Sequence, residues 1–569
     1  MNKEDPPMNN SPIRYMINPT DTNRYQILSA SLEQVGRSED FENIIIGLNP
    51  PTDILHYVEP GEFKSLKIGI IGAGLAGLSA AYELRKTGAD ITVFDALEDR
   101  IGGRVYTYHF DKNKPYYGEM GPMRIPVSHG TTWHYINQFN LITVPMFYSD
   151  SNNILYLRHK RVRRDTEEGF LKENLYKEFA LTQAEETVSM SALSDYAYSS
   201  ILRSLSAEAR KEILQILPSY TREYTTILNH SNRQIFEMLG LSQDCITLLA
   251  GTNTVTGSLL NNSYGETLGE VYSLDYKNLY RISGGMDTLP KAFYNSLTSK
   301  APAEYGLHPE VLGSVTIKQG HVMTGIYNTS QQNSILLKYT TKNRKEIMEV
   351  FDYVICAIPF STLREIDINP LFSNQKMQAI RELNYVDSLK ASFLCNRRFW
   401  EEDAEYGRMN GGISTTDLPI QSILYPTDHV NCTDDASCLP KESGVLTAAY
   451  SINYDSIRIA NQSEEKRYDL IRHNVEQVHG LADGYLDKVI DAIKIIDWNK
   501  EPWFRGGYVV DLPGQKVNFA YSILEPEYNN HLFFAGEHTS AKHGWMQGAL
   551  HSGMLAANTL VHNAKQINS

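Results

Sequence analysis

The sequence predicts an α/β protein with a doubly wound, Rossmann-like nucleotide-binding domain, a second domain with a mixed sheet, and a helical domain. KIGIIGAG (67–74) is an apolar run ending in glycine, LAGLSAAYELRKTG (75–88) has helical spacing closed by Gly88, and ADITVFDA (89–96) is a second strand pattern. A strand, a glycine turn, a helix and a strand within about 30 residues form a βαβ unit. Residues 166–280 have mostly helical patterns, whereas 311–358 and 385–455 read as strands and turns.

The composition is that of a large, acidic globular protein. Of the 569 residues, 42% are hydrophobic, which is too many for a disordered chain. Lys and Arg number 53 and Asp and Glu number 67, so the formal net charge is −14. This charge argues against general binding to nucleic acid or to an anionic membrane.

The sequence contains no stretch of the ~20 apolar residues that a membrane span needs. The first ten residues lack the apolar core of a signal peptide, so we expect a cytoplasmic protein, with secretion left open. Five Cys residues exclude a disulfide scaffold. Cys432 and Cys438 fall in an expected exposed loop, where two free thiols are favoured over a local disulfide.

A glycine-rich turn connects the first strand to the first helix of the βαβ unit. Gly72, Gly74 and Gly77, with Leu75 and Ala76 between them, fit the pattern G-x-G-x-x-G. The N-terminus of the following helix can bind a pyrophosphate, because its N–H groups and its dipole favour an anion. Asp95 ends the next strand, where a carboxylate can accept hydrogen bonds from ribose hydroxyls.

The residues after Asp95 favour FAD over NAD as the nucleotide. Ala96 is followed by Arg100-Ile101-Gly102-Gly103-Arg104. A second glycine pair beside an Arg, just beyond the ribose, can bind the flavin-side phosphate. An NAD enzyme has no need of such a segment there.

Several motifs in order along the chain resemble the flavin amine oxidases, and among them L-amino-acid oxidases most. They are GAGLAGLSAAYEL, VFDA, GGRV and GPMRIP in 67–126, RISGGMDTLP (281–290), FDYVICAIPFSTL (351–363), DSLKASF (387–393), GGISTTDLPIQSILYP (411–426) and FFAGEHTSAKHGWMQGALHSGMLAA (533–557). The resemblance extends from about Leu66 to Ala557.

The resemblance implies the domain organisation. We expect an FAD domain of the glutathione-reductase type formed by 65–106, 281–362 and 505–565, and a substrate domain formed by 107–165 and 363–504. A helical domain covers 166–280, and residues 1–64 form an N-terminal arm.

The implied reaction is the oxidation of an L-α-amino acid. A hydride passes from Cα to flavin N5, the imino acid hydrolyses to a 2-oxo acid and ammonia, and O2 is reduced to H2O2. Gly506-Gly507-Tyr508 lacks the Cys that carries covalent flavin in monoamine oxidases, so we expect non-covalent FAD. Homodimerisation is a family expectation.

The resemblance assigns roles to substrate-contacting residues. Arg124 would hold the substrate carboxylate, since a guanidinium can bind a carboxylate with two parallel hydrogen bonds. The hydroxyl of Tyr425 would meet the same carboxylate. Lys390 would hold a water against flavin N5 and stabilise negative charge during O2 reduction. Trp545 would form one wall of the substrate cleft, and the Gly544 carbonyl would accept from the substrate amine.

The remaining implied cofactor contacts follow the same motifs. Glu537 would bind the ribityl chain, and Val315 would touch adenine through its backbone. The other expected contacts are Gly103, Arg104, Gly121, Pro122, Met123, Gly536, Met546, Gln547, Gly548 and Ala549.

One feature of the family has no clear match here. Some members have a His in the helical region that is proposed as a base, and the local alignment places Asp275 near it. A carboxylate there could select cationic substrates such as Lys or Arg. Glu266, Glu270 and Asp275 are the candidates, and a solvated helix face is the competing interpretation.

Other functions stay open at this point or are disfavoured. An amine or polyamine oxidase, an amino-acid monooxygenase that forms an amide, and a catalytically idle flavoprotein are the alternatives. His538 and His543 without a Cys or a third His make a poor zinc site, so no metal is expected.

Overall fold

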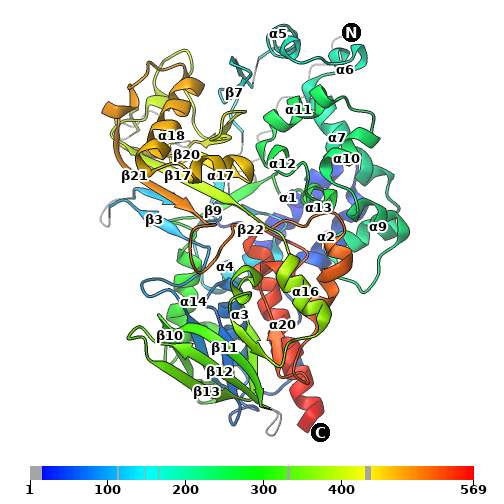
Figure 1. Cartoon of the computed structure of the whole chain (residues 1–569), viewed down its shortest axis with the longest axis vertical. Coiled ribbons are helices and arrows are strands. Elements are labelled where there is room, and N and C mark those ends of the chain that lie inside the picture. The colour runs from blue at the N-terminus through cyan, green and yellow to red at the C-terminus, as the bar shows by residue number, and fades with distance from the viewer. Residues whose placement is uncertain are drawn as a thin grey trace.

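The computed structural model describes residues 16–111, 115–147, 149–164, 166–329, 334–429 and 438–568 (Figure 1). In Figure 1 a parallel sheet with its helices occupies the lower half, a larger mixed sheet the upper left, and a group of helices the upper right. The chain is therefore an α/β protein with a parallel sheet and mixed sheets, as the sequence predicts.

The parallel sheet has five strands in the order β10-β2-β1-β14-β23. They are β1 (Lys67–Ile71), β2 (Asp90–Asp95), β10 (Val315–Gln319), β14 (Tyr353–Cys356) and β23 (Leu532–Phe534). The central strands β1, β2 and β14 are buried on both faces, which explains their continuous apolar runs. The strands come from the three separated segments that the sequence assigns to one domain, while the exact domain boundaries remain predictions.

Helices α3 (Leu75–Arg85) and α20 (Met546–Asn568) pack against each other. Ser79 Oγ donates to the Leu550 carbonyl at 3.1 Å. A Cβ at Gly553 would overlap Ser79 Oγ and the Ala76 carbonyl oxygen, so only glycine permits this approach. The C-terminal helix thereby becomes part of the half of the molecule that contains the parallel sheet.

A seven-stranded mixed sheet, in the order β21-β17-β20-β19-β18-β7-β8, forms the second half. Its strands are β7 (Ile154–Leu157), β8 (Lys160–Arg163), β17 (Ser388–Cys395), β18 (Ile413–Thr416), β19 (Ser422–Leu424), β20 (Gly444–Ile452) and β21 (Ile490–Asp497). Helices α17 (Tyr454–Ala460) and α18 (Glu464–His479) pack on it.

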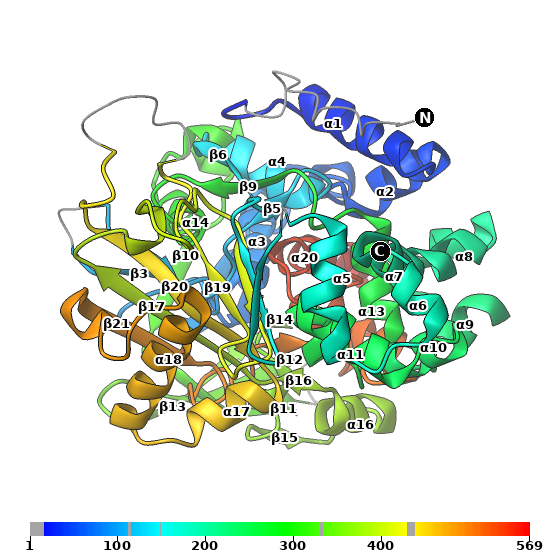
Figure 2. The same cartoon turned by 90° about the horizontal axis from the view of Figure 1, so that it is seen from above.

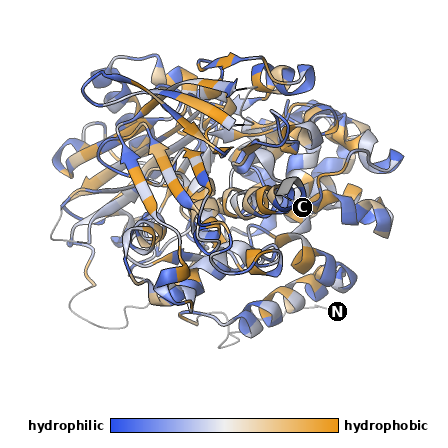
Figure 3. Cartoon of the chain, turned by 90° about the horizontal axis from the view of Figure 1, so that it is seen from below, coloured by the Kyte–Doolittle hydropathy of each residue, from blue (hydrophilic) through white to orange (hydrophobic). Residues whose placement is uncertain are grey.

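Four smaller sheets account for the other strands of the described residues. They comprise β13-β12-β11-β15, with β11 (Val322–Thr329), β12 (Ser334–Thr340), β13 (Glu346–Phe351) and β15 (Asp367–Asn369); β5-β9-β6, with β5 (Ile125–Pro126), β6 (Thr143–Met146) and β9 (Leu279–Ile282); β3 (Thr107–His109) with β4 (Tyr117–Glu119); and β16 (Tyr385–Val386) with β22 (Tyr508–Val509). Hydrophobic residues run along the strands, whereas the outer helices carry hydrophilic faces (Figure 3).

The helical layer contains α5 (Glu168–Asn174), α6 (Gln183–Thr187), α7 (Met190–Ser204), α8 (Ala207–Lys211), α9 (Arg222–Leu228), α10 (Asn232–Met238), α11 (Gln243–Thr252), α12 (Thr254–Ser258) and α13 (Tyr264–Tyr272). The N-terminal helices α1 (Asp21–Gln34) and α2 (Phe41–Leu48) lie along one edge of the molecule (Figure 2). The remaining helices are α4 (Gly130–Gln138), α14 (Thr288–Thr298), α15 (Phe360–Leu363), α16 (Asn374–Glu382) and α19 (Tyr521–Leu524).

The structure bears on two predictions from the sequence, one about membrane-spanning segments and one about free thiols. Among the described residues, no helix combines the length and apolar character of a membrane span. Cys438 is disulfide-bonded, so the expectation of a free thiol there is wrong, and Cys432 lies outside the described residues. Cys245, Cys356 and Cys395 are free and buried.

The crossing of α3 and α20 generates a stability prediction. Gly553→Ala adds a methyl group where Ser79 and the Ala76 carbonyl already lie, so it should lower the free energy of unfolding by about 1–3 kcal/mol. Gly269→Ala in α13 is the matched control, because its Cβ meets open space; it should be neutral or stabilising by up to about 1 kcal/mol. Urea unfolding of both variants measures the difference, and equal effects would contradict the close packing.

Candidate active site

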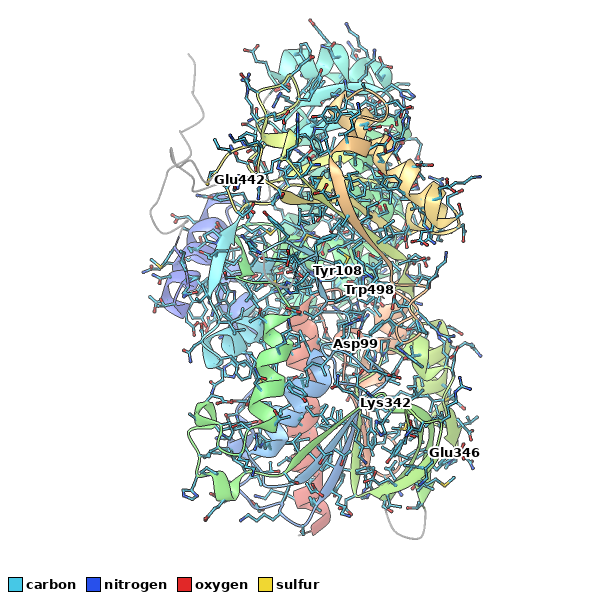
Figure 4. All side chains as sticks on the ribbon, turned by 90° about the vertical axis from the view of Figure 1, so that its left-hand side faces the viewer. Asp99, Tyr108, Lys342, Glu346, Glu442 and Trp498 are labelled. Carbon is cyan, nitrogen blue, oxygen red and sulfur yellow. The ribbon has the colours of Figure 1, made fainter. Side chains whose placement is uncertain are left out.

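One cavity of about 430 Å³ lies where the parallel sheet, the seven-stranded sheet and the helical layer meet. The carboxyl ends of the parallel strands contribute Gly72, Asp95, Ala357 and Gly536, which is where doubly wound sheets bind ligands. Strand β17 contributes Lys390. In Figure 4 Trp498, another lining residue, lies midway between the two halves of the molecule.

The turn between β1 and α3 leaves room for an anion. Gly74 is the N-cap of α3 and provides no side-chain cap, and a Cβ at Gly74 would meet only open space. The first N–H groups of α3 are therefore available to a ligand phosphate. A Cβ at Gly72, which has φ +104°, would lie 2.9 Å from the Ala357 carbonyl oxygen, and one at Gly77 would overlap the Gly72 carbonyl oxygen. This cradle fits the pyrophosphate of FAD.

Asp95 lies beside this turn with its carboxylate oriented by the backbone. Its two oxygens accept from Ala73 N at 2.6 Å and from Leu97 N at 2.8 Å. Burial raises its pKa to about 6 despite these bonds. Each oxygen keeps acceptor capacity, which suits the ribose hydroxyls of the predicted nucleotide.

Glu537 follows the edge strand β23 and connects three other segments of the chain through hydrogen bonds. It accepts from Arg104 Nη1 at 3.1 Å, from Val509 N at 3.2 Å and from Gly544 N at 3.0 Å. Both Arg104 and Glu537 line the cavity. The contacts fix the turn that precedes α20.

Arg124 and a set of aromatic residues form the opposite wall. The Arg124 guanidinium carbon lies 5.2 Å from the ring centroid of Tyr276. The Tyr276 hydroxyl donates to Glu270 Oε1 at 3.0 Å, and Trp545 Nε1 lies 3.4 Å from the same oxygen. Tyr276 thus lies between a cation and a carboxylate, and Trp545 contacts the same carboxylate.

Lys390 is buried between the two halves. Its ammonium donates to the Gly121 carbonyl and lies 4.7 Å from the ring centroid of Tyr450. Burial, together with the positive charge of Arg124, lowers its pKa to about 7, although Glu119 opposes this. Lys390 can therefore exchange a proton near neutral pH.

A second group of charges lies where α13 meets the turn before α20. His543 Nδ1 is 2.8 Å from Glu266 Oε1. Burial acts to lower the pKa of His543. The negative charge and hydrogen bond of Glu266 act in the opposite direction, and the net pKa is raised to about 10. Ligand atoms of Glu266, Asp511 and His543 lie within 4.8 Å of one another. Because Glu266 and His543 already pair with each other, we interpret the group as a structural ion pair.

Most residues predicted from the motifs line this cavity. They are Gly72, Gly74, Leu75, Ala76, Asp95, Ala96, Gly103, Arg104, Gly121, Pro122, Met123, Arg124, Lys390, Gly536, Glu537, Gly544, Trp545, Met546 and Ala549. Gly77, Gln547 and Gly548 are not among the lining residues. Gly77 and Gly548 serve close packing, and Gln547 bonds Thr132 N and the Leu48 carbonyl.

Tyr425, predicted to meet the substrate carboxylate, is not among the residues that line the cavity. Its hydroxyl bonds Ser414 Oγ at 2.8 Å and His479 Nε2 at 2.9 Å, inside the core of the seven-stranded sheet. It follows β19 with its ring turned into the helix-covered face of this sheet. The Leu-Tyr-Pro string alone could not reveal which face the tyrosine takes, because alternate residues of a strand point in opposite directions.

Val315 and Asp275 also lie outside the cavity lining. Val315 begins β10 and pairs with Ile91, roughly 13 Å along the strand from Asp95. Val322, after the hairpin turn, lines the cavity instead. Asp275 is fully buried between Lys542 and His129 Nε2, the latter at 3.1 Å. Burial opposes ionisation of Asp275, but these two partners lower its pKa to about 2.

The motifs did not reveal several lining aromatic residues. They are Tyr276, Tyr450, Trp498, Phe504 and Tyr508. Tyr450 and Tyr508 lie on strands β20 and β22, and Tyr276 follows α13. A lone aromatic residue in a strand pattern is typical of a core position, so only the tertiary arrangement shows that these rings surround one space.

Comparison with known proteins agrees with this geometry. The family model described as flavin containing amine oxidoreductase matches residues 75–561. An L-amino-acid oxidase of Sistrurus catenatus edwardsii is 27% identical over 500 residues, covering 86% of each chain. The L-amino acid oxidase bordonein-L of Crotalus durissus terrificus is 28% identical over 542 residues, covering 92% of this chain and 91% of its own.

Two solved structures share the fold. Putrescine oxidase bound to putrescine has a TM-score of 0.62 and 18% identity, covering 89% of this chain and 99% of its own. Cyclohexylamine oxidase of Brevibacterium oxydans has a TM-score of 0.61 and 16% identity, covering 89% of this chain and all of its own. At these identities the likeness concerns the fold alone.

The Glu266–His543 pair generates a pH prediction. The pKa of His543 is raised from about 6.5 to about 10, so its stabilisation is complete below about pH 6.5 and is lost as the pH rises through about 10. Compared with His543→Gln, the wild-type advantage in unfolding free energy should fall by up to about 1.4 kcal/mol per pH unit in this window. Denaturant titrations from pH 6 to 10 measure it, and an advantage independent of pH would refute the ion pair.

Proposed function

This chain belongs to the family of flavin-containing amine oxidoreductases, and we propose that it is an L-amino-acid oxidase with non-covalent FAD. Bound FAD would accept a hydride from the substrate Cα and pass the electrons to O2, with a 2-oxo acid, ammonia and H2O2 as products. The Arg124 guanidinium on the cavity wall carries the proposal, since the substrate of an amine oxidase has no carboxylate to bind there. The snake L-amino-acid oxidases at 27–28% identity support the same assignment.

Arg124 would bind and orient the α-carboxylate. A planar guanidinium gives two parallel charge-assisted hydrogen bonds, which fix both the position and the rotation of the bound acid group. The Tyr276 ring at 5.2 Å supports the guanidinium through a cation–π contact. Once its carboxylate is fixed, the substrate can still rotate about the bond between the carboxylate and Cα. Contacts with the walls of the cleft can restrict this rotation.

The turn before α20 would position the amine. Gly544 N donates to Glu537, which holds this turn, and a Cβ at Gly544 would lie 2.9 Å from the Tyr508 ring. The Gly544 carbonyl is the proposed acceptor for the substrate amine, with Trp545 as the adjoining wall. Cofactor contacts are proposed for the lining residues of the glycine turn, Asp95, Arg104 and Glu537.

Lys390 would act in the oxygen-consuming half of the cycle. Its pKa of about 7 allows it to carry a positive charge near the reacting centre, or to hold and move a proton, at physiological pH. A cation there stabilises negative charge that develops during O2 reduction. Lys390→Met should therefore slow the return of the yellow absorbance after O2 is added more than it slows anaerobic bleaching by substrate.

The test of the function is a product assay with the twenty amino acids. We expect at least one L-amino acid to release H2O2 and a 2-oxo acid in equal amounts. Arg124→Leu should lower kcat/KM by about 30-fold to several thousand-fold, because it removes a desolvated charge pair worth about 2–5 kcal/mol. Arg381→Leu, whose side chain is 74% exposed, is the matched control and should leave kcat/KM unchanged.

Two outcomes would contradict the proposal and indicate a different reaction. Full activity of Arg124→Leu, or oxidation of amines such as putrescine but not of amino acids, would indicate an amine or polyamine oxidase. Formation of an amide and CO2 would indicate an amino-acid monooxygenase.

A further inference from the structure

Three carboxylates near Trp545 differ in their partners. Asp275 is held by Lys542 and His129, and Glu266 is held by His543. Among the residues that the structure describes, no basic side chain forms an ion pair with Glu270. The sequence left all three as candidates for binding a substrate cation, and two of them are already paired with cations of the protein itself.

The Glu270 carboxylate lines the cavity and receives only neutral donors. The Tyr276 hydroxyl at 3.0 Å and Trp545 Nε1 at 3.4 Å both contact Oε1, whereas no hydrogen bond from the described part of the chain reaches Oε2. Burial, and then the negative charge of Asp275, raises the Glu270 pKa to about 7, while Lys542 and Arg124 oppose the rise. A buried carboxylate with a vacant acceptor oxygen is stabilised by a cationic donor.

Glu270 and Arg124 lie at the two ends of one binding surface on the cavity wall. Tyr276 connects them, because its ring lies below the guanidinium and its hydroxyl bonds the carboxylate. The Tyr276 ring lies between the two charges, and the Trp545 ring lies beside it, with 6.0 Å between the ring centroids, so both rings can contact the stem and the cationic end of a ligand. A ligand with a carboxylate at one end and a cation at the other complements this wall.

We propose that Glu270 determines substrate specificity and that the substrate class is the basic L-amino acids, whose side chains end in an ammonium or guanidinium group. The inference rests on the proposed function and adds the identity of the side chain. Arg124 holds the α-carboxylate and Glu270 holds the side-chain cation. A neutral side chain leaves the Glu270 carboxylate desolvated and without a cation, which disfavours neutral amino acids. The net charge of −14 also attracts cationic substrates.

The first experiment compares nearly isosteric substrate pairs on the FAD-loaded enzyme. L-Lysine is paired with L-norleucine, and L-arginine with L-citrulline. In the wild type kcat/KM should be at least about tenfold higher for the cationic member of each pair. Glu270→Gln should reduce this ratio to near one by lowering kcat/KM for the cationic member, and Glu270→Asp should retain part of it.

Glu310→Gln is the matched control, since its side chain is 87% exposed and does not line the cavity. It should keep the wild-type ratios. Flavin absorbance per protein in each variant verifies that folding and cofactor loading are intact.

The second experiment measures binding without turnover at Cα. 6-Aminohexanoate carries the carboxylate and the distal ammonium of lysine but no α-amine, and hexanoate lacks both nitrogens. The inhibition constant should be at least about tenfold lower for 6-aminohexanoate in the wild type, and the two constants should converge in Glu270→Gln.

The outcomes separate this inference from the function on which it rests. Oxidation of amino acids with no cationic preference, or with a preference that Glu270→Gln leaves intact, would overturn the inference and leave the function standing. Equal loss for both members of each pair would show that Glu270 meets the α-amine, which all amino acids share, and would also overturn it. Absence of any amino-acid oxidation would overturn both.

Discussion

Buried ion pairs fix the turn from Glu537 to Met546, and the candidate site depends on that turn. Lys542 pairs with Asp275 and His543 with Glu266, which attaches the turn to α13 and the residues after it. Glu537 attaches the same turn to Arg104 and to Val509 N. Removing one partner of such a pair typically costs about 3–5 kcal/mol, because the other charge stays buried. Trp545, Gly544 and the start of α20 therefore have fixed positions relative to α13 and to the segments that carry Arg104 and Val509.

The parts of the fold that depend on local sequence were predictable. The βαβ unit follows from apolar runs, glycine positions and helical spacing, all within about 30 residues. The pairing of β10, β14 and β23 with this unit was expected from the family motifs, not from any local signal, because parallel neighbours lie hundreds of residues apart. The order of the seven-stranded sheet, in which β7 lies beside β18 more than 250 residues later, had no sequence signal at all.

The residues of the candidate site likewise fall into those that the sequence could assign and those that it could not. Gly72 has a positive φ, Gly74 is the N-cap of α3 beside open space, and Asp95 ends a strand, so these three residues could be assigned from their local motifs. Tyr425, Val315 and Asp275 could not, because their roles depend on which face of a strand, which end of a strand and which partner side chain they meet. Asp275 and Glu270 are five residues apart and both carry a carboxyl group, yet only Asp275 has a basic partner among the described residues.

The contact between α3 and α20 has a consequence for biosynthesis. The hydrogen bond from Ser79 to Leu550 spans 471 residues. At about 5–20 residues per second, a ribosome needs roughly 25 to 95 seconds to translate those residues. During that time the surface of α3 that α20 covers stays exposed, so the nascent half with the parallel sheet is a natural client for chaperones.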